Sequence, residues 1–253
     1  MSFRSRVVWC AGVLAGATIL IGPGGVSAQE ELPGIELGLT YASSYLPALA
    51  VQPFMGSFGG DEIAPQVEAI VGRDMRNSDR FEVLDSLPGA IVGEQVDYGL
   101  WDRLGAVWLV TGQVEGAGDG YVLIVELHDV VYGEVRERGR FRLPDQTDED
   151  FRMAVHRISD EVVRWATGDP GMAATRIAFS MLGSDNNKEI YVIDADGENL
   201  HQVTRYGSMT ESATWSPDGS RLALASWKTG VPRIYEIDRF GENERMVPAL
   251  RGL

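Results

Sequence analysis

Apolar residues in the first half of the chain recur with helical spacing in two segments. From Asp61 to Asn77 they return every three or four positions and so share one face of a helix, namely Ile63, Val67, Ile70, Val71 and Met75. Asp61 is placed to cap this helix, and Pro65 fits its first turn, where a missing N–H donor costs little. A second amphipathic helix is predicted from a capping-box-like start at Thr147, with Asp150 three positions on, to a stop at Gly168.

Extended segments in the same half of the chain predict a sheet. They cover residues 35–41, 49–54, 81–84, 107–115, 121–130 and 135–143. The segment 121–130 is apolar on both faces, which predicts a central strand, whereas the charges along 135–143 favour an edge strand. A short helix at 97–104 is stopped by Gly105. The pattern indicates an α/β region in which helices pack on a mixed sheet of about five strands.

Near residue 175 the pattern changes to short strands separated by turns, and it repeats. Residues 177–180 resemble 222–225, and residues 190–194 resemble 234–238, with an offset of 44 to 45 positions. Repeats of this length with several short strands are typical of β-propeller blades. Between the copies, Pro217-Asp218-Gly219 predicts a turn, because proline fixes φ and glycine accepts a positive φ.

The first 28 residues have the pattern of a signal peptide. Arg4 and Arg6 precede an uncharged run from Val7 to Ile21, and small residues then fit cleavage after Ala28. The alternative interpretation of this run is a membrane anchor. The run is shorter than the ~18 residues of a spanning helix, which favours the signal peptide. Cleavage removes Cys10, the one cysteine, and leaves a chain suited to an oxidising compartment. The predicted organisation is a signal peptide over 1–28, an α/β domain over 29–170 and all-β propeller blades over 171–253.

Composition narrows the possible functions. With 37 acidic and 22 basic residues the formal charge is −15, which disfavours binding to nucleic acid. The acidic residues around Gly197 (Asp194, Asp196 and Glu198) lack the full calcium-loop spacing, and a hairpin turn explains them. His128, His156 and His201 have no partners at ligand spacing and are interpreted as structural or surface residues. Trp215 is interpreted as a core residue between blades. No nucleophile elbow or phosphate loop occurs, and we predict no cofactor and no metal.

Several motifs together carry a resemblance to a known family. Trp215-Ser216-Pro217-Asp218-Gly219, followed by Leu222-Ala223-Leu224-Ala225, resembles the propeller repeat of the TolB family. The segment 71–81, with its Arg76-Asn77-Ser78 run, resembles part of the TolB amino-terminal domain. Residues 104–114, 156–162 and 175–178 resemble its central strand, its last helix and its entry into the first blade. The resemblance spans roughly residues 35 to 250 in order.

This resemblance implies a periplasmic, non-enzymatic scaffold of a Tol–Pal-type system that links the layers of the cell envelope during division. It implies an α/β amino-terminal domain and a six-bladed propeller. The propeller would bind a Pal-like peptidoglycan-associated lipoprotein. The mature amino terminus would bind a TolA-like protein, or dock back on the chain. The positions that this carries over are Glu30, Glu31, Leu32, Ile35, Glu36 and Leu37.

The predicted propeller is short. About two blades are predicted where six are expected, so we expect a truncated chain that lacks roughly 180 residues. Two alternatives remain open. One is a stand-alone periplasmic adaptor with another partner. The other is the front part of an exported hydrolase, with a propeller that shields a nucleophile beyond residue 253.

Overall fold

The structure is a computed structural model that describes residues 45–84 and 95–248. The predicted cleavage site, the predicted strand at 35–41 and the predicted partner-binding positions Glu30 to Leu37 lie outside the described residues.

The first group of strands forms one mixed sheet. It contains β1 (Ala48–Val51), β2 (Met55–Ser57), β3 (Glu82–Val83), β4 (Trp108–Ala117), β5 (Gly120–Asp129) and β6 (Glu134–Leu143). Their order is β3-β1-β4-β5-β6, and β2 also pairs with β4. β1 runs parallel to β3 and β4, whereas β4, β5 and β6 are antiparallel neighbours. The prediction that β5 is interior and β6 an edge is confirmed.

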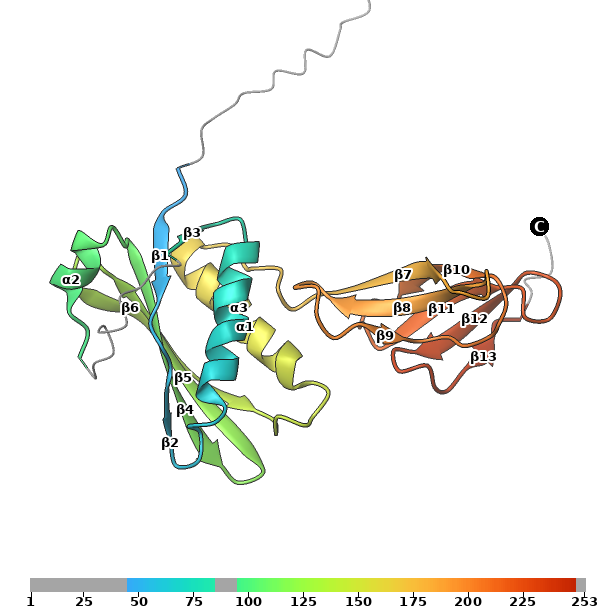
Figure 1. Cartoon of the computed structure of the whole chain (residues 1–253), viewed down its shortest axis with the longest axis horizontal. Helices are drawn as coiled ribbons and strands as arrows, with labels where there is room; N and C mark the ends of the chain where they lie inside the picture. The colour runs from blue at the N-terminus through green and yellow to red at the C-terminus, as the bar shows by residue number, and fades with distance from the viewer. Residues whose placement is uncertain (1–44, 85–94, 249–253) are drawn as a thin grey trace, which may run out of the picture. The chain divides into compact units, whose positions relative to one another are not determined.

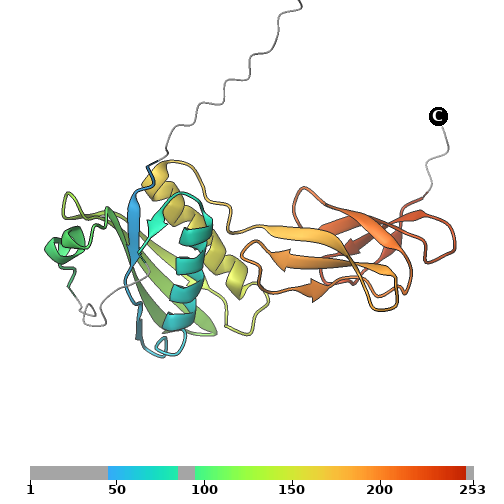
Figure 2. The same ribbon diagram turned by 45° about the horizontal axis from the view of Figure 1, so that its top comes forward.

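Two helices cover one face of this sheet. α1 (Ala64–Asn77) and α3 (Phe151–Thr167) lie side by side on it in both views (Figure 1 and Figure 2). Their apolar stripes meet strand residues such as Leu49, Val110 and Leu123 in the main core. The short α2 (Tyr98–Arg103) buries Trp101 against Ala50 and Leu109. Because neighbouring strand residues point to opposite faces, α2 covers the other side of the sheet.

Three predicted boundaries are wrong, each for a local reason. The predicted strand 49–54 ends at Val51 as β1, and β2 begins only after it at Met55, since Pro53 has no amide proton and Phe54 N–H donates to the Glu68 carboxylate at 3.0 Å. Asp61 does not cap α1, because the Gly60 carbonyl accepts the amides at the helix start. α3 begins at Phe151 rather than at Thr147, whose amide donates to the Asp145 side chain in a preceding turn.

The second group of strands forms two antiparallel sheets. One holds β7 (Arg176–Leu182), β8 (Lys188–Asp194) and β9 (His201–Gln202). The other holds β10 (Thr210–Trp215), β11 (Arg221–Ser226), β12 (Arg233–Asp238) and β13 (Arg245–Met246). β7, β8 and β9 begin 44 or 45 residues before β11, β12 and β13, so the sequence repeat is a repeat of strands. The two sheets share one apolar cluster, to which Ile190, Leu222 and Tyr235 belong.

The turn predicted at Pro217-Asp218-Gly219 is present between β10 and β11. Gly219 N–H donates to the Ser216 carbonyl at 2.9 Å, and Gly219 has a φ of +68°. The Asp218 carboxylate accepts from the Ser216 hydroxyl at 2.6 Å and from the Ser220 amide at 3.1 Å. These donors lower the pKa of Asp218 to about 2. Within the described ranges, no helix combines the length and apolar character needed to cross a bilayer.

Two glycine substitutions test the packing of the first sheet. A Cβ at Gly112 in β4 would lie 2.4 Å from the ring of Phe54, so we expect Gly112→Ala to destabilise the fold by about 1–3 kcal/mol. A Cβ at Gly72 in α1 meets nothing closer than 3.8 Å, so Gly72→Ala should stabilise it by about 0.5–1 kcal/mol. Urea unfolding followed by circular dichroism measures both changes. Equal effects of the two substitutions would contradict this packing.

Candidate functional site

Charged side chains gather where the two helices meet the second group of strands. Four carboxylates take part: Asp150 at the start of α3, and Asp194, Asp196 and Glu198 at the end of β8 and in the turn after it. Four arginines face them: Arg73 on α1, Arg152 on α3, Arg176 on β7 and Arg239 after β12. We call these eight residues the charge network.

The turn after β8 supplies most of the negative charge. Gly197, with a φ of +84°, closes it by donating from its amide to the Asp194 carbonyl at 2.9 Å, so the predicted hairpin turn is confirmed. Asp196 has a side chain only 2% exposed, and it is ion-paired with both Arg152 and Arg73. Arg73 also donates to Glu198 at 2.8 Å. A turn that the sequence explains by local chemistry therefore presents carboxylates to α1 and α3.

Asp196 is held in its ionised form. Burial alone would raise the pKa of Asp196, but the Glu198 amide and the Arg152 guanidinium stabilise the carboxylate and lower its pKa below the usual value. Asp194 is 1% exposed at its side chain, and Arg176 Nε donates to it at 3.3 Å. Because charges this buried need partners, each arginine is a structural requirement of the turn.

Asp150 extends the network to the second sheet. Its carboxylate accepts from Arg239 Nη2 at 2.9 and 3.0 Å and from Arg176 Nη2 at 3.4 Å. Burial would raise the pKa of Asp150, but the hydrogen bonds and positive charge of Arg239 and then Arg176 lower it. The sequence predicts that the side chain of Asp150 takes part in a helix cap. In the structure this side chain instead links α3 to the turn after β12.

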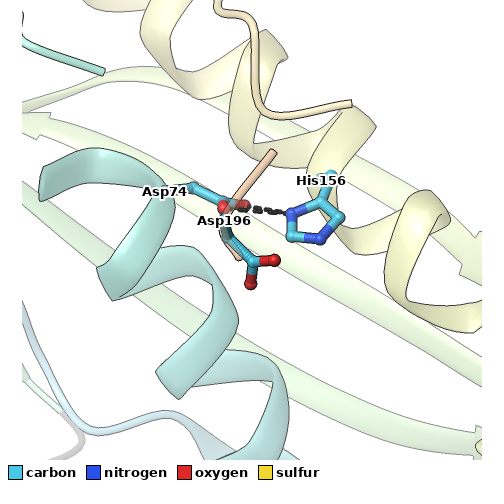
Figure 3. A group of neighbouring side chains, drawn as sticks. All are labelled: Asp74, His156 and Asp196. Atoms are coloured by element: carbon cyan, nitrogen blue, oxygen red, sulfur yellow. Dashed lines mark hydrogen bonds and ion pairs between the residues drawn. The ribbon is translucent and has the colours of Figure 1, made fainter. Parts of the chain in front are cut away.

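A buried pair lies directly beside the network. His156 on α3 is fully buried, and its Nδ1 lies 2.9 and 3.0 Å from the two carboxylate oxygens of Asp74 on α1 (Figure 3). A carboxylate can only accept here, so Nδ1 carries the proton and donates it. His156 Nε2 has no hydrogen-bond partner within the described part of the chain. The pair joins α1 to α3 next to Asp196.

Asp74, His156 and Asp196 bring one ligand atom each within 4.8 Å of one another. The surroundings do not favour a cation, because Asp196 already faces the positive charges of Arg152 and Arg73. A metal ion would have to displace both guanidiniums or sit beside them. We therefore assign these residues to a hydrogen-bonded and ion-paired cluster, not to a metal centre.

A groove of about 610 Å³ opens next to the pair and the network. The exposed Met172 and Ile177 form part of its wall, whereas the side chains of Asp74, Ser159 and Asp196 beneath it are almost fully buried. The chain between α3 and β7 borders the groove and is fixed by Asp160, whose carboxylate accepts from the Ala173 and Ala174 amides at 2.7 and 3.0 Å.

The other histidines and Trp215 have structural surroundings. His128 is buried between the Tyr98 hydroxyl and the Thr111 hydroxyl, each at 3.0 Å. Burial lowers the pKa of His128, although the negative charge of Glu126 acts in the opposite direction. His201 lies 3.0 Å from the Arg239 carbonyl, and Trp215 packs against the shared cluster of the two sheets. The sequence analysis missed the partners of all three histidines, because nothing in the spacing indicates them.

The chain thus combines a mixed α/β layer with repeated antiparallel sheets, and a charge network joins the two. Residues 37–135 match the model of the TolB amino-terminal domain. A Tol-Pal system protein TolB from Albidiferax ferrireducens is 32% identical over 251 residues, which are 98% of this chain and 55% of that protein. One from Actinobacillus pleuropneumoniae is 28% identical over 259 residues, which are 100% of this chain and 57% of that protein. The crystal structure of TolB from Acinetobacter baumannii matches with a TM-score of 0.68 at 26% identity, covering 83% of this chain and 51% of that one.

The chain belongs to the TolB family, as the motifs predicted. It spans about half the length of the curated relatives that it matches.

The buried pair predicts strong coupling between two residues. His156→Ala should lower the free energy of unfolding by about 3–5 kcal/mol, because it leaves the Asp74 carboxylate buried without its partner. In the Asp74→Asn background the same substitution should cost at least about 1 kcal/mol less. Unfolding in urea of the four proteins of this double-mutant cycle measures the coupling. Ser159→Ala is the control, since this buried hydroxyl has no partner among the described residues and its loss should be nearly neutral. Additive costs would contradict the pairing.

The charge network predicts that the stability of the fold decreases at acidic pH. Asp150 and Asp196 have lower pKa values in the folded chain than in the unfolded chain, where the value is 3.8. Their contribution to the free energy of unfolding is therefore complete above pH 3.8, and it is lost as the pH falls through the pKa values of the folded chain. We expect urea stability measured from neutral pH down to about 3 to fall less steeply in Asp150→Asn/Asp196→Asn than in the parent. The exposed pair Asp102→Asn/Asp119→Asn removes the same charge and serves as control. Parallel pH profiles of parent and network variant would refute this role.

Proposed function

We propose that the chain is a non-enzymatic binding component of a Tol–Pal-type system. After export and cleavage behind Ala28 it would act in the periplasm and help to keep the outer membrane intact during cell division. The sheets β7–β9 and β10–β13 would be two blades of a β-propeller, in a domain that begins near residue 171 and follows an α/β domain over 29–170. The relatives named Tol-Pal system protein TolB support this assignment.

The charge network is the observation that carries the proposed mechanism. Ion pairs such as Arg73–Asp196 and Arg239–Asp150 connect the helices to the turns at the ends of β8 and β12. A change at either side must keep or break these ion pairs, of which Arg73–Asp196 includes a carboxylate only 2% exposed. Such contacts have discrete states, so they can transmit binding from one part of the chain to the other.

The proposed partners bind at different places. A Pal-like lipoprotein would bind the blades, and a TolA-like protein would bind the mature amino terminus at Glu30, Glu31, Leu32, Ile35, Glu36 and Leu37. The same segment would dock back on the chain when TolA is absent. Pal binding and TolA binding would then influence one another.

Deletion of the amino-terminal segment tests this coupling. Residues 29–253 and residues 45–253 are titrated calorimetrically with the soluble domain of the Pal-like protein, and separately with that of the TolA-like protein. We expect the deletion to abolish TolA binding and to change Pal affinity by about 5-fold or more, the range of ordinary coupling energies. Leu32→Ala/Ile35→Ala/Leu37→Ala should reproduce both effects.

A substitution outside the segment provides the control. Tyr132→Ala, at an exposed position in the β5–β6 turn, should leave both affinities unchanged. Unchanged Pal and TolA affinities in the deletion protein would refute the coupling. Binding of neither partner by residues 29–253 would favour the adaptor with another periplasmic partner.

A further inference from the structure

Arginines form a ladder on the edge strand of the first sheet. Arg138, Arg140 and Arg142 of β6 lie opposite Glu126, Ile124 and Val122 of β5. Residues two apart in a strand point to the same face, so the three side chains stand in one row. This is the face that α1 and α3 leave open, because the alternate β5 residues Leu123 and Val125 belong to the core beneath those helices. Arg136 lies at the bulge where the row begins.

Among the described strands, none pairs with the outer side of β6. The strand is ten residues long and is hydrogen-bonded to β5 alone among the described strands. Its side chains from Glu134 to Arg138 are all exposed. An edge of this length presents alternating N–H and C=O groups that can pair with another extended chain.

The guanidinium groups of the ladder keep much of their binding capacity. Arg138 is 63% exposed and contacts Glu126 through Nε at 3.3 Å, and Arg140 is 66% exposed and contacts Glu115 through Nη2 at 3.3 Å. Arg142 makes no ion pair in the part of the chain that the structure describes. A guanidinium has five N–H donors, so one contact each leaves most of them for a ligand.

The opposite face of the same edge is aromatic. Gly139 leaves room for Trp165 of α3, because a Cβ there would lie 2.8 Å from the Trp165 ring and 2.2 Å from Phe141. The Trp165 and Phe141 rings pack at 6.2 Å between centroids. A strand added to β6 would place every second side chain beside the arginines. Its remaining side chains would lie on the other face, beside the aromatic surface.

We propose that the β6 edge binds an extended, acidic segment of a partner protein, which pairs with β6 as an additional strand. Acidic residues at every second position of that segment lie against Arg138, Arg140 and Arg142, and apolar residues between them lie beside Trp165. Side chains two apart in a strand repeat every ~6.8 Å, which matches the repeat of the ladder. Backbone pairing supplies affinity, and the alternate side chains supply specificity.

Charge favours this occupant over the others. A second copy would bring its own arginine row against this one, which opposes an edge-to-edge dimer. Nucleic acids and anionic lipid surfaces offer no extended peptide backbone that could pair with the N–H and C=O groups of the β6 edge. The surface is built from β5, β6 and α3 and includes no residue of the sheets β7–β13, which are the proposed Pal site.

A peptide of defined pattern tests the proposal. The probe is a capped, fluorescent peptide of about ten residues, the length of β6, in which Glu alternates with Val or Thr. Its binding to residues 29–253 is followed by fluorescence anisotropy, and protection of the β6 amides is followed by hydrogen exchange. We expect saturable binding that weakens with salt and slows exchange along β6.

Matched variants locate the binding surface. Arg138→Gln/Arg140→Gln/Arg142→Gln should weaken binding by about tenfold or more, as expected for the loss of three exposed ion pairs. Arg103→Gln/Arg157→Gln/Arg233→Gln removes the same charge at other exposed positions and should leave the affinity within about twofold. Thermal unfolding of both variants confirms that they fold.

Matched peptides separate strand pairing from simple attraction of charge. N-methylation at alternate positions removes the donors along one edge of the peptide, so one of the two methylation patterns should abolish binding and the other should not. A peptide of the same composition with its Glu residues clustered should bind more weakly. Equal binding of all these peptides, absence of exchange protection in β6, equal loss in both arginine variants, or no binding at all would overturn the proposal. So would preference for anionic vesicles over the peptide.

Discussion

The buried Asp196 carboxylate is the constraint on which the joining of the two groups of strands depends. Its side chain is almost inaccessible, yet it remains charged because two arginines on the helices face it. Removing a carboxylate from water costs several kcal/mol unless a partner of opposite charge comes with it. The turn after β8 is therefore stable in this position only when α1 and α3 present Arg73 and Arg152. Helix packing, in turn, holds those arginines in place through the Asp74–His156 pair between the same two helices.

The outline of the fold follows from patterns within short stretches of sequence. The apolar stripe of α1, the interior position of β5 and the repeat that relates β7–β9 to β11–β13 were all predictable from periodicity. The errors occur where a side chain or a carbonyl replaces the expected partner. Thr147 was expected to begin α3, but the Asp145 carboxylate takes its amide. The strand expected at 49–54 ends early because Phe54 donates to Glu68, which lies on another element.

The candidate site could not be predicted in the same way, because its contacts join distant parts of the chain. Arg73 and Asp196 are 123 positions apart, and Arg239 and Asp150 are 89 apart. No spacing rule covers such separations, and each residue alone has an ordinary interpretation. Gly197 and its acidic neighbours predict a turn, and they form one. That interpretation is correct and incomplete, since one Asp196 oxygen serves the turn by accepting from the Glu198 amide while the other faces the arginines.

Asp150 shows how such a site alters local structure. It occupies the cap position of α3, where a side-chain hydrogen bond to the helix amides is worth ~1 kcal/mol. Its carboxylate makes no such bond and binds Arg239 and Arg176 instead. The Asp150 side chain is 42% exposed, so solvent screens these ion pairs and each contributes about 0–1 kcal/mol; together they offset the missing cap only while both arginines stay in place. The start of α3 is thus stabilised by residues from β7 and from the turn after β12, and the helix end and the sheets depend on one another. This mutual dependence is the physical property that a protein with two binding regions requires if one region is to sense the other.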